Sequence, residues 1–210
     1  MFAIIQRGGP LMYLIAVCSI LALAITIERL FHFYRAKIDT RSFLREIASA
    51  IKKNQIVEAI EICDRTPGPV AHTLKEGILR HDSPKEDIKE AVSNAAMVEI
   101  PRLEKNLGVL ATVAHITPLL GLLGTVSGMI RCFQVIQEKA SMFSPVNPSD
   151  LAEGIWVALI TTAAGLTVAI PTLVAYNYLV SRVNNFVLDV ERSATDLVTM
   201  LSKRSDGYQQ

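Results

Sequence analysis

The chain has 210 residues, of which 50% are hydrophobic and only 20% are charged, and 21 Lys and Arg against 20 Asp and Glu give a net charge of +1. This composition excludes an intrinsically disordered chain, and the balanced charge gives no indication of a nucleic-acid partner. The cysteines at 18, 63 and 132 lie far apart and form no C-x-x-C pair, which argues against a disulfide framework, a zinc site or a thiol redox centre. We therefore expect no metal and no cofactor.

Three long runs of the chain contain no Asp, Glu, Lys or Arg. They cover residues 8–27, 106–130 and 154–181. A membrane-spanning helix needs about 20 largely apolar residues, so each run is long enough to cross a bilayer. We predict membrane helices at 8–27, 107–130 and 154–181.

The basic residues that flank the first run predict its orientation. Only Arg7 precedes the run, whereas a cluster of basic residues follows it: Arg29, Arg35, Lys37, Arg41 and Arg45. By the positive-inside rule, residues 1–7 are an external N-terminus, and the chain is cytoplasmic from residue 28 onward. The segment 131–153 is then an external loop, and residues 182–210 form a cytoplasmic C-terminal helix and tail that frays at its end.

The segment 28–106 has 14 Lys and Arg and 13 Asp and Glu, which is too polar for lipid, and we predict a cytoplasmic helical domain. Capping by Asp39 or Thr40 predicts a helix that ends near Lys52. Further helices are expected at 56–64 and at about 70–80, separated by the break Pro-Gly-Pro at 67–69.

After this domain no strong helix stop occurs between Pro84 and Arg131. We therefore predict one long helix that begins at Pro84, continues through the second membrane run, and is kinked at Pro101 and Pro118. The third membrane helix should also continue into the cytoplasm, because apolar residues recur after it at heptad spacing: Val183, Val187, Val190, Ala194, Leu197 and Leu201. Packing on the chain's own helices and self-association explain this repeat equally well.

Small and hydroxylated residues share one face of each of the last two membrane helices. In the second helix these are Gly121, Thr125, Gly128 and Cys132, with Gly124 and Gly128 also forming a G-x-x-x-G pair. In the third helix they are Ala158, Thr162, Gly165, Ala169, Thr172 and Tyr176. Such faces serve close helix packing, a water-accessible polar wall, or both.

His115 is the one residue in the three runs from the group Asp, Glu, Lys, Arg and His. It is either a packed or interfacial histidine or a member of a proton relay. A proton path without a carboxylate is incomplete, so a second protein should supply the acid. No metalloprotease motif or phosphate-binding loop occurs, and we predict that the protein is not an enzyme.

At this point two segments become recognisable. The segment TPLLGLLGTVSGMI (117–130) resembles the second-helix signature of the MotA/TolQ/ExbB proton-channel family, and ALITTAAGLTVAIP (158–171), followed by AYN (175–177), resembles the third-helix signature. The three apolar runs, the external N-terminus and the large first cytoplasmic segment are similar to the ExbB/TolQ branch of that family.

The resemblance implies an all-α integral membrane protein of the bacterial inner membrane, with three transmembrane helices, a periplasmic N-terminus and a cytoplasmic C-terminus. It implies a homopentamer around a dimer of an ExbD/TolR-like protein, whose single membrane helix carries an aspartate. Proton flow through this complex would drive mechanical work at the cell envelope.

The two important membrane threonines of the family fall on Thr125 and Thr162, which become the expected proton pathway. Further candidates for the pathway or pore lining are His115, Thr172 and Tyr176, and the residues expected to serve helix packing are Gly121, Gly124, Gly128 and Gly165. One departure is Val157, which stands where many relatives carry a glutamate; Glu153 lies one turn earlier. The alternative function is a non-conducting oligomeric membrane scaffold.

Overall fold

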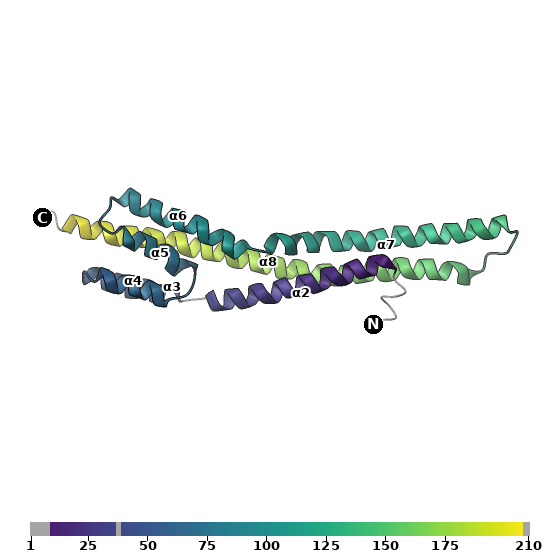
Figure 1. The fold of residues 1–210 in the computed structure, drawn as a ribbon, viewed down its shortest axis with the longest axis horizontal. Coiled ribbons are helices and arrows are strands. Elements are labelled where there is room, and N and C mark those ends of the chain that lie inside the picture. Colours follow the sequence, from purple (N-terminus) through teal and green to yellow (C-terminus); the bar gives the residue numbers. More distant parts are fainter. Residues whose placement is uncertain (1–8, 37–38, 208–210) are drawn as a thin grey trace. The chain divides into compact units, whose positions relative to one another are not determined.

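The computed structural model describes residues 9–36 and 39–207, in which helices are joined by short connections (Figure 1). The helices are α2 (Pro10–Ala36), α3 (Thr40–Lys52), α4 (Ile56–Arg65), α5 (Pro69–Leu79), α6 (Lys85–Glu104), α7 (Leu107–Ser141) and α8 (Pro148–Gly207). The expected external segment 1–7 and the expected frayed end at 208–210 lie outside the described residues. The all-helical prediction is confirmed for the described part of the chain.

The chain divides into two compact units, each described by itself. The apolar unit comprises the described residues of 9–28 and 106–178, and the charged unit comprises those of 29–105 and 179–207. From Pro10, Leu107 and Gly154 onward, the three uncharged runs lie in α2, α7 and α8, which are long and apolar enough to cross a membrane by length and composition. In these helices large side chains such as Leu23, Leu119 and Leu159 are exposed, as expected for surfaces that contact lipid.

The first three helices of the charged unit, α3, α4 and α5, begin and end within one residue of where the sequence predicts. Asp39 caps α3 by accepting hydrogen bonds from the backbone N–H groups of Arg41 and Ser42, at 3.1 and 3.3 Å. Gly68 has a φ of 122°, which a residue with a side chain rarely adopts, and this turn separates α4 from α5. The core of this unit is made of large aliphatic side chains, among them Ile47, Leu74, Ile78 and Leu197.

The prediction of one continuous helix from Pro84 through the second membrane run is wrong. The helix is interrupted at Lys105 and Asn106, so that α6 ends at Glu104 and α7 begins at Leu107. Asn106 adopts a left-handed backbone with a φ of 64°, and its side-chain amide donates a hydrogen bond to the Glu28 carboxylate at 3.1 Å. Asparagine tolerates this conformation better than most residues, because its short polar side chain bonds locally. Helix α7, which contains the second uncharged run, is therefore a helix separate from α6.

The segment 131–153, expected to be an external loop, is mostly helical. Helix α7 runs on to Ser141 and α8 starts at Pro148, which leaves only 142–147 as the connection. Lys139 and Asp150 form an ion pair across this connection, and Asp150 also accepts a hydrogen bond from the backbone N–H of Asn147 at 2.9 Å. The hydrogen bond from Lys139, followed by that from Asn147, lowers the pKa of Asp150 below its ordinary value.

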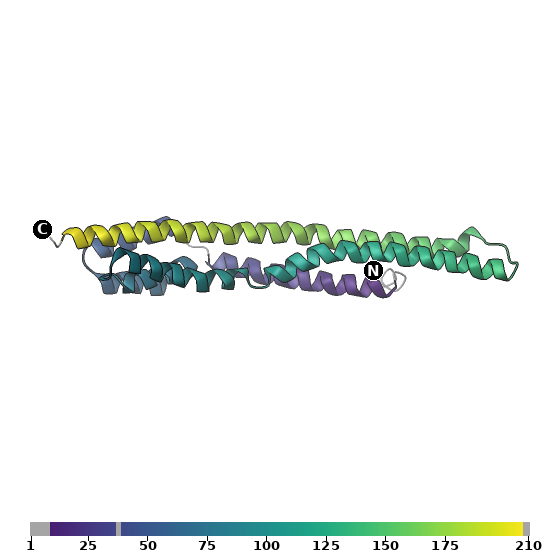
Figure 2. The ribbon, with the colours of Figure 1, turned by 90° about the horizontal axis from the view of Figure 1, so that it is seen from above.

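Helix α8 has 60 residues. It is drawn as one unbroken helix (Figure 2), so the prediction that the third apolar run continues as a helix is confirmed. Its heptad residues Val190, Leu197 and Leu201 are buried with residues of α3, α4, α5 and α6 in the core of the charged unit. This repeat therefore packs on the chain's own helices.

Candidate functional site

Helices α7 and α8 run antiparallel in the apolar unit and approach each other at glycines. A Cβ atom added to Gly121 would lie 3.0 Å from the Cα of Thr162, and one added to Gly128 would lie 2.5 Å from the carbonyl oxygen of Gly154. Across the contact, a Cβ on Gly165 would lie 2.8 Å from the carbonyl oxygen of Thr117. The two backbones are thus in direct contact, which only residues without a side chain permit. We call this contact the seam.

Thr161 fills the seam at the level of Gly124. It is 0% exposed, and its side chain occupies the space that a Cβ on Gly124 would need. Its hydroxyl donates to the carbonyl oxygen of Val157 at 2.8 Å, within its own helix. Thr117 is likewise fully buried and donates to the carbonyl of Val113 at 2.6 Å. The sequence reasoning missed both threonines, although each stands four residues before a glycine of the seam.

Thr162 makes a hydrogen bond that joins the two helices. Its hydroxyl donates to the carbonyl oxygen of Gly121 at 3.0 Å, and the side chain is half-buried at the edge of the seam. Thr125 is also half-buried, and its hydroxyl donates to the carbonyl of Leu122 at 2.6 Å in its own helix. Neither side chain is sealed inside the seam, so both hydroxyl oxygens border the surface of the helix pair.

Thr125 and Thr162 face the same side of this helix pair. Gly124 and Thr161 touch in the seam, and the residue after each of them is rotated by about 100° around its helix axis. Because the helices run in opposite directions, these two rotations turn Thr125 and Thr162 toward one common side. The structure therefore brings the two predicted pathway residues to one edge, which we call the threonine edge.

The other candidate pathway residues lie apart from this edge. Thr172 is buried and donates to the carbonyl of Val168 at 2.7 Å, and Tyr176 is half-buried further along α8. His115 is exposed, and its Nδ1 lies 2.7 Å from the carbonyl oxygen of Ala111. It stands ten positions before Thr125, about 15 Å along the helix axis. The structure does not bring His115 to the threonine edge.

Val157, which the sequence resemblance to the family singles out because it replaces a glutamate, is buried in the structure. Val157 is 4% exposed, so a carboxylate at this position would be buried. Glu153 is exposed near the start of α8. Within residues 9–36 and 39–207, no three His, Cys, Asp or Glu side chains gather to hold a metal ion. Chemically, the threonine edge offers hydroxyl oxygens in an apolar setting and no acid of its own.

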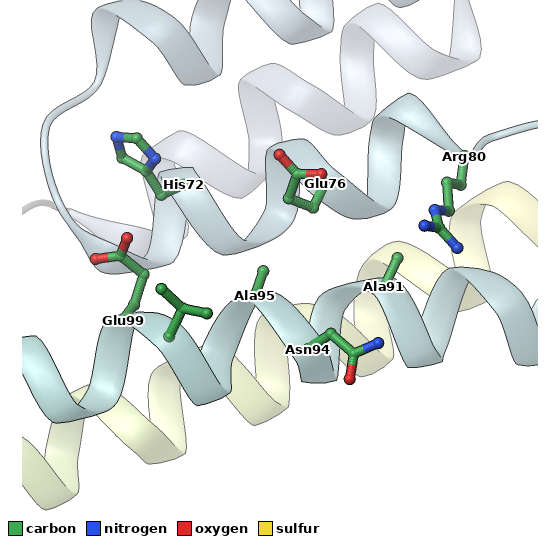
Figure 3. A pocket seen from close by; sticks show the side chains of 8 residues that line it. His72, Glu76, Arg80, Ala91, Asn94, Ala95 and Glu99 are labelled. Carbon is green, nitrogen blue, oxygen red and sulfur yellow. The ribbon is translucent and has the colours of Figure 1, made fainter.

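A hollow of about 330 Å³ lies on the charged unit between α5 and α6 (Figure 3). The side chains of Ala91 and Ala95 point toward α5. Arg80 and Glu99 lie near the two ends of the hollow. Glu99 already accepts a hydrogen bond from Arg102 at 2.7 Å, and Arg80 is exposed to solvent. This mixture of solvated and paired charges shows no convergent chemistry, and we place the candidate functional site at the threonine edge.

Comparison with known proteins places this chain in a wider group. Residues 65–192 match the family described as the MotA/TolQ/ExbB proton channel family. The chain is 29% identical over 188 residues to a putative biopolymer transport protein ExbB homolog of Methanothermobacter thermautotrophicus, covering 89% of this chain and 65% of that protein. It is 36% identical over 177 residues to a putative ExbB-like biopolymer transport protein of Synechocystis, covering 83% and 68%. A Tol-Pal system protein TolQ of Haemophilus influenzae is 38% identical over 130 residues, covering 60% and 55%.

Proposed function

Because the chain belongs to the MotA/TolQ/ExbB proton channel family, in its ExbB/TolQ-like branch, we propose that it is the proton-channel subunit of an inner-membrane motor. In this proposal the protein is the stator and couples the proton motive force to mechanical work at the cell envelope. It is a component of energy transduction and transport rather than an enzyme.

The observation that carries this proposal is the threonine edge. Thr125 and Thr162 present hydroxyl groups on one side of an apolar helix pair whose runs, 107–130 and 154–181, contain no formal charge. Polar groups inside a membrane are costly and usually serve transport or helix association. The glycines of the seam bring the two helices together, and the Thr162 hydroxyl adds one hydrogen bond between them. Both hydroxyl oxygens can still accept hydrogen bonds at the edge.

The missing acid implies a partner. We propose an ExbD/TolR-like protein with a single membrane helix, whose aspartate carries the proton past the threonine edge. A homopentamer of this chain would surround a dimer of that partner within the lipid bilayer. The orientation proposed from the basic residues places the N-terminus in the periplasm and the charged unit, with the C-terminus, in the cytoplasm.

Reconstitution in liposomes tests this function. Under an imposed membrane potential, the chain alone should acidify the interior no faster than empty liposomes, and the chain with its ExbD/TolR-like partner should conduct protons. A large flux without the partner would contradict the proposal and would direct attention to His115, for which His115→Ala is then the decisive variant. Native mass spectrometry in detergent should show an oligomer, and a monomer alone would exclude the pentamer.

Substitution of the two threonines tests their assignment to the proton pathway. Thr125→Val and Thr162→Val keep the side-chain shape but remove the hydroxyl, and each should reduce proton flux about tenfold or more while the complex still assembles. An interhelical hydrogen bond in a membrane contributes only about 0.6–2 kcal/mol, which is too little to dismantle the oligomer. Thr167→Val is the matched control, because the Thr167 hydroxyl is exposed and donates to Ala163 of its own helix at 2.7 Å. If all three variants behave alike, either all active or all unassembled, the threonines serve packing and the proton pathway assigned to them is wrong.

A further inference from the structure

Helices α6 and α8 leave an open groove between them on the charged unit. The two helices run in opposite directions there (Figure 1), and the described residues that line the groove all belong to them. Its volume of about 680 Å³ lies within the range of about 300–1,000 Å³ that is usual for small-molecule sites. It shares no described lining residue with the hollow between α5 and α6, so the two are separate features.

Most of the groove is lined by aliphatic side chains. Val92, Val190 and Val198 are buried, and Ala194 beside them is partly buried. Met97 also lines the groove and is 64% exposed to solvent. Covering such a surface with an apolar chain removes it from water, which is favourable roughly in proportion to the area covered. The groove therefore favours a ligand with a long apolar part.

Basic groups gather at one end of the groove. Lys85 and Lys89 both line it and stand one helical turn apart at the start of α6. Within the described part of the chain, neither ammonium group has an ion-pair or hydrogen-bond partner. The N-cap residue Pro84 offers no side-chain cap, so the partial positive charge of the helix start adds to that of the lysines. This end of the groove suits an anion.

The acidic residue among the described groove residues lies away from the two lysines. Because the helices run in opposite directions, the start of α6 faces Thr199 of α8, and Glu191 stands eight positions, about 12 Å, before Thr199. Ile100 and Val187 line the end of the groove that is farthest from the lysines. The groove thus has a positive end and an apolar remainder, which is complementary to a molecule with one anionic group and one hydrocarbon tail.

We propose that this groove binds a free fatty acid, whose carboxylate lies between Lys85 and Lys89 and whose hydrocarbon chain follows the apolar lining toward Ile100 and Val187. Two ammonium groups on flexible stems can both reach one carboxylate. The site belongs to the charged unit, and the proposed proton channel does not require it, so its test is independent of that function.

Two other occupants fit the groove less well. A phospholipid carries two chains, and a single groove between two helices would cover one of them and leave the other in water. A second copy of this chain would need an apolar stripe to insert. In α3, α4 and α5, all of which the structure describes, the large apolar side chains that are exposed are Val57 and Leu79, one on α4 and one on α5.

Photolabelling of the full chain in phosphatidylcholine nanodiscs tests the proposal. The probe is palmitic acid with a diazirine on its tail, and mass spectrometry identifies the labelled peptides. Labels should fall on residues 92–100 and 187–198. Dodecanoate should compete, whereas dodecyltrimethylammonium, which has the same tail and a positive head, should not. Decanoate, which is shorter by two methylene groups, should compete about tenfold more weakly than dodecanoate.

The lysines are tested by Lys85→Gln combined with Lys89→Gln, which should weaken the competition by dodecanoate about tenfold. The matched control is Lys52→Gln combined with Lys53→Gln, because these two lysines are exposed at the end of α3 and do not line the groove. Equal labelling and competition in the wild type and the groove variant would overturn the proposal, because the lysines would then not select the anion.

A carboxylate in the groove gives the second test. Met97→Glu should abolish the labelling, because it places a negative charge beside the tail. Val98→Glu is the matched control, since Val98 is 56% exposed and lines the hollow between α5 and α6 instead. Both positions are exposed, so both variants should keep the thermal denaturation midpoint of the wild type. Labelling that survives Met97→Glu would contradict the assignment of the tail to this groove.

Three further results would overturn the proposal. Competition by dodecyltrimethylammonium as strong as that by dodecanoate would show that the tail alone decides binding. Phosphatidylglycerol in the nanodisc that suppresses labelling as well as dodecanoate does would assign the groove to membrane lipid. Native mass spectrometry in which Met97→Glu loses its oligomer while Val98→Glu keeps it would make the groove a contact between copies of the chain.

Discussion

The two units of the chain use opposite rules to bring helices together. In the charged unit the buried contacts are made by large aliphatic side chains such as Ile47, Leu74 and Ile78. In the apolar unit the seam is made of glycines and threonines, and large residues such as Leu119 and Leu159 point outward. Water drives large apolar side chains together, whereas lipid tails are as apolar as leucine and give no such drive. Helices in lipid therefore gain more from close backbone contact and hydrogen bonds.

The first prediction removes volume from the charged unit. Leu74→Ala deletes a fully buried side chain and should lower the free energy of unfolding of this unit by about 2–5 kcal/mol. Hydrogen exchange of the α5 amides in detergent measures the loss. The control is Leu122→Ala, which shortens an exposed side chain of α7 and should have a much smaller effect. Equal losses in both variants would mean that the same packing rule governs both units.

The second prediction adds volume to the seam. Gly124→Ala places a methyl group in the space that the Thr161 side chain occupies, so it should destabilise the helix pair by about 1–3 kcal/mol and reduce proton flux. Gly108→Ala is the matched control on the same helix, because a Cβ at Gly108 meets nothing within 4 Å. Thermal denaturation in detergent and flux in liposomes give the two readouts.

A compensating variant makes this test sharper. In Gly124→Ala combined with Thr161→Gly, the space for the new methyl group is opened on the opposite helix, and flux should recover most of the loss. If Thr161→Gly fails to rescue Gly124→Ala, the contact between these two positions does not set the spacing of the helix pair.

The two units also differ in how much of their structure the sequence predicts. In the charged unit the ends of α3, α4 and α5 follow from local chemistry, as in the Asp39 cap and the turn at Gly68, and the sequence predicted them. In the apolar unit the uncharged runs predicted where the long apolar helices lie in the sequence. They did not predict which face of each helix packs against its neighbour. Thr161 and Thr162 are adjacent, and which of them enters the seam depends on a rotation of about 100° that the partner helix decides. The sequence therefore predicted the residue at the edge and missed the one inside.

The break at Lys105 and Asn106 was unpredictable for a related reason. Asn106 bonds to Glu28, a residue 78 positions earlier in the chain, and this contact accompanies the left-handed backbone that separates α6 from α7. Local patterns showed only two prolines, Pro101 and Pro118, both of which lie inside helices of the structure. The periodicity of a sequence does not predict contacts between residues so far apart in the chain.

The third prediction concerns the connection of α7 and α8, where the apolar unit uses an ion pair. Asp150→Asn removes the partner of Lys139 and should speed the hydrogen exchange of residues 142–147, with little change elsewhere. The pKa of Asp150 is lowered in the folded chain, so its contribution is present above the ordinary value of 3.8 and is lost as the pH falls through the lower folded value. The wild-type connection should therefore loosen only below about pH 4. Glu153→Gln removes an equal charge one turn away and should not reproduce the effect.

The fourth prediction assigns one cysteine reporter to each unit. Burial, with a smaller contribution from the neighbouring Asp64, raises the pKa of the Cys63 thiol to about 12. The thiolate is the reactive form, so Cys63 should resist N-ethylmaleimide at pH 8 until the charged unit opens. Cys132 reports on the seam instead, because it is buried there and its thiol donates to the carbonyl of Leu151 at 3.4 Å.

In a background with Cys18 replaced by Ala, the two cysteines test whether the two packing rules act independently. Leu74→Ala should accelerate the labelling of Cys63 and leave Cys132 unchanged, because it opens only the core of the charged unit. Gly124→Ala should accelerate the labelling of Cys132 and leave Cys63 unchanged, because it separates only the seam. Mass spectrometry of the labelled peptides gives both rates from one sample. If either variant accelerates both cysteines to the same extent, the units open together through the continuous helix α8, and their stabilities are not separable.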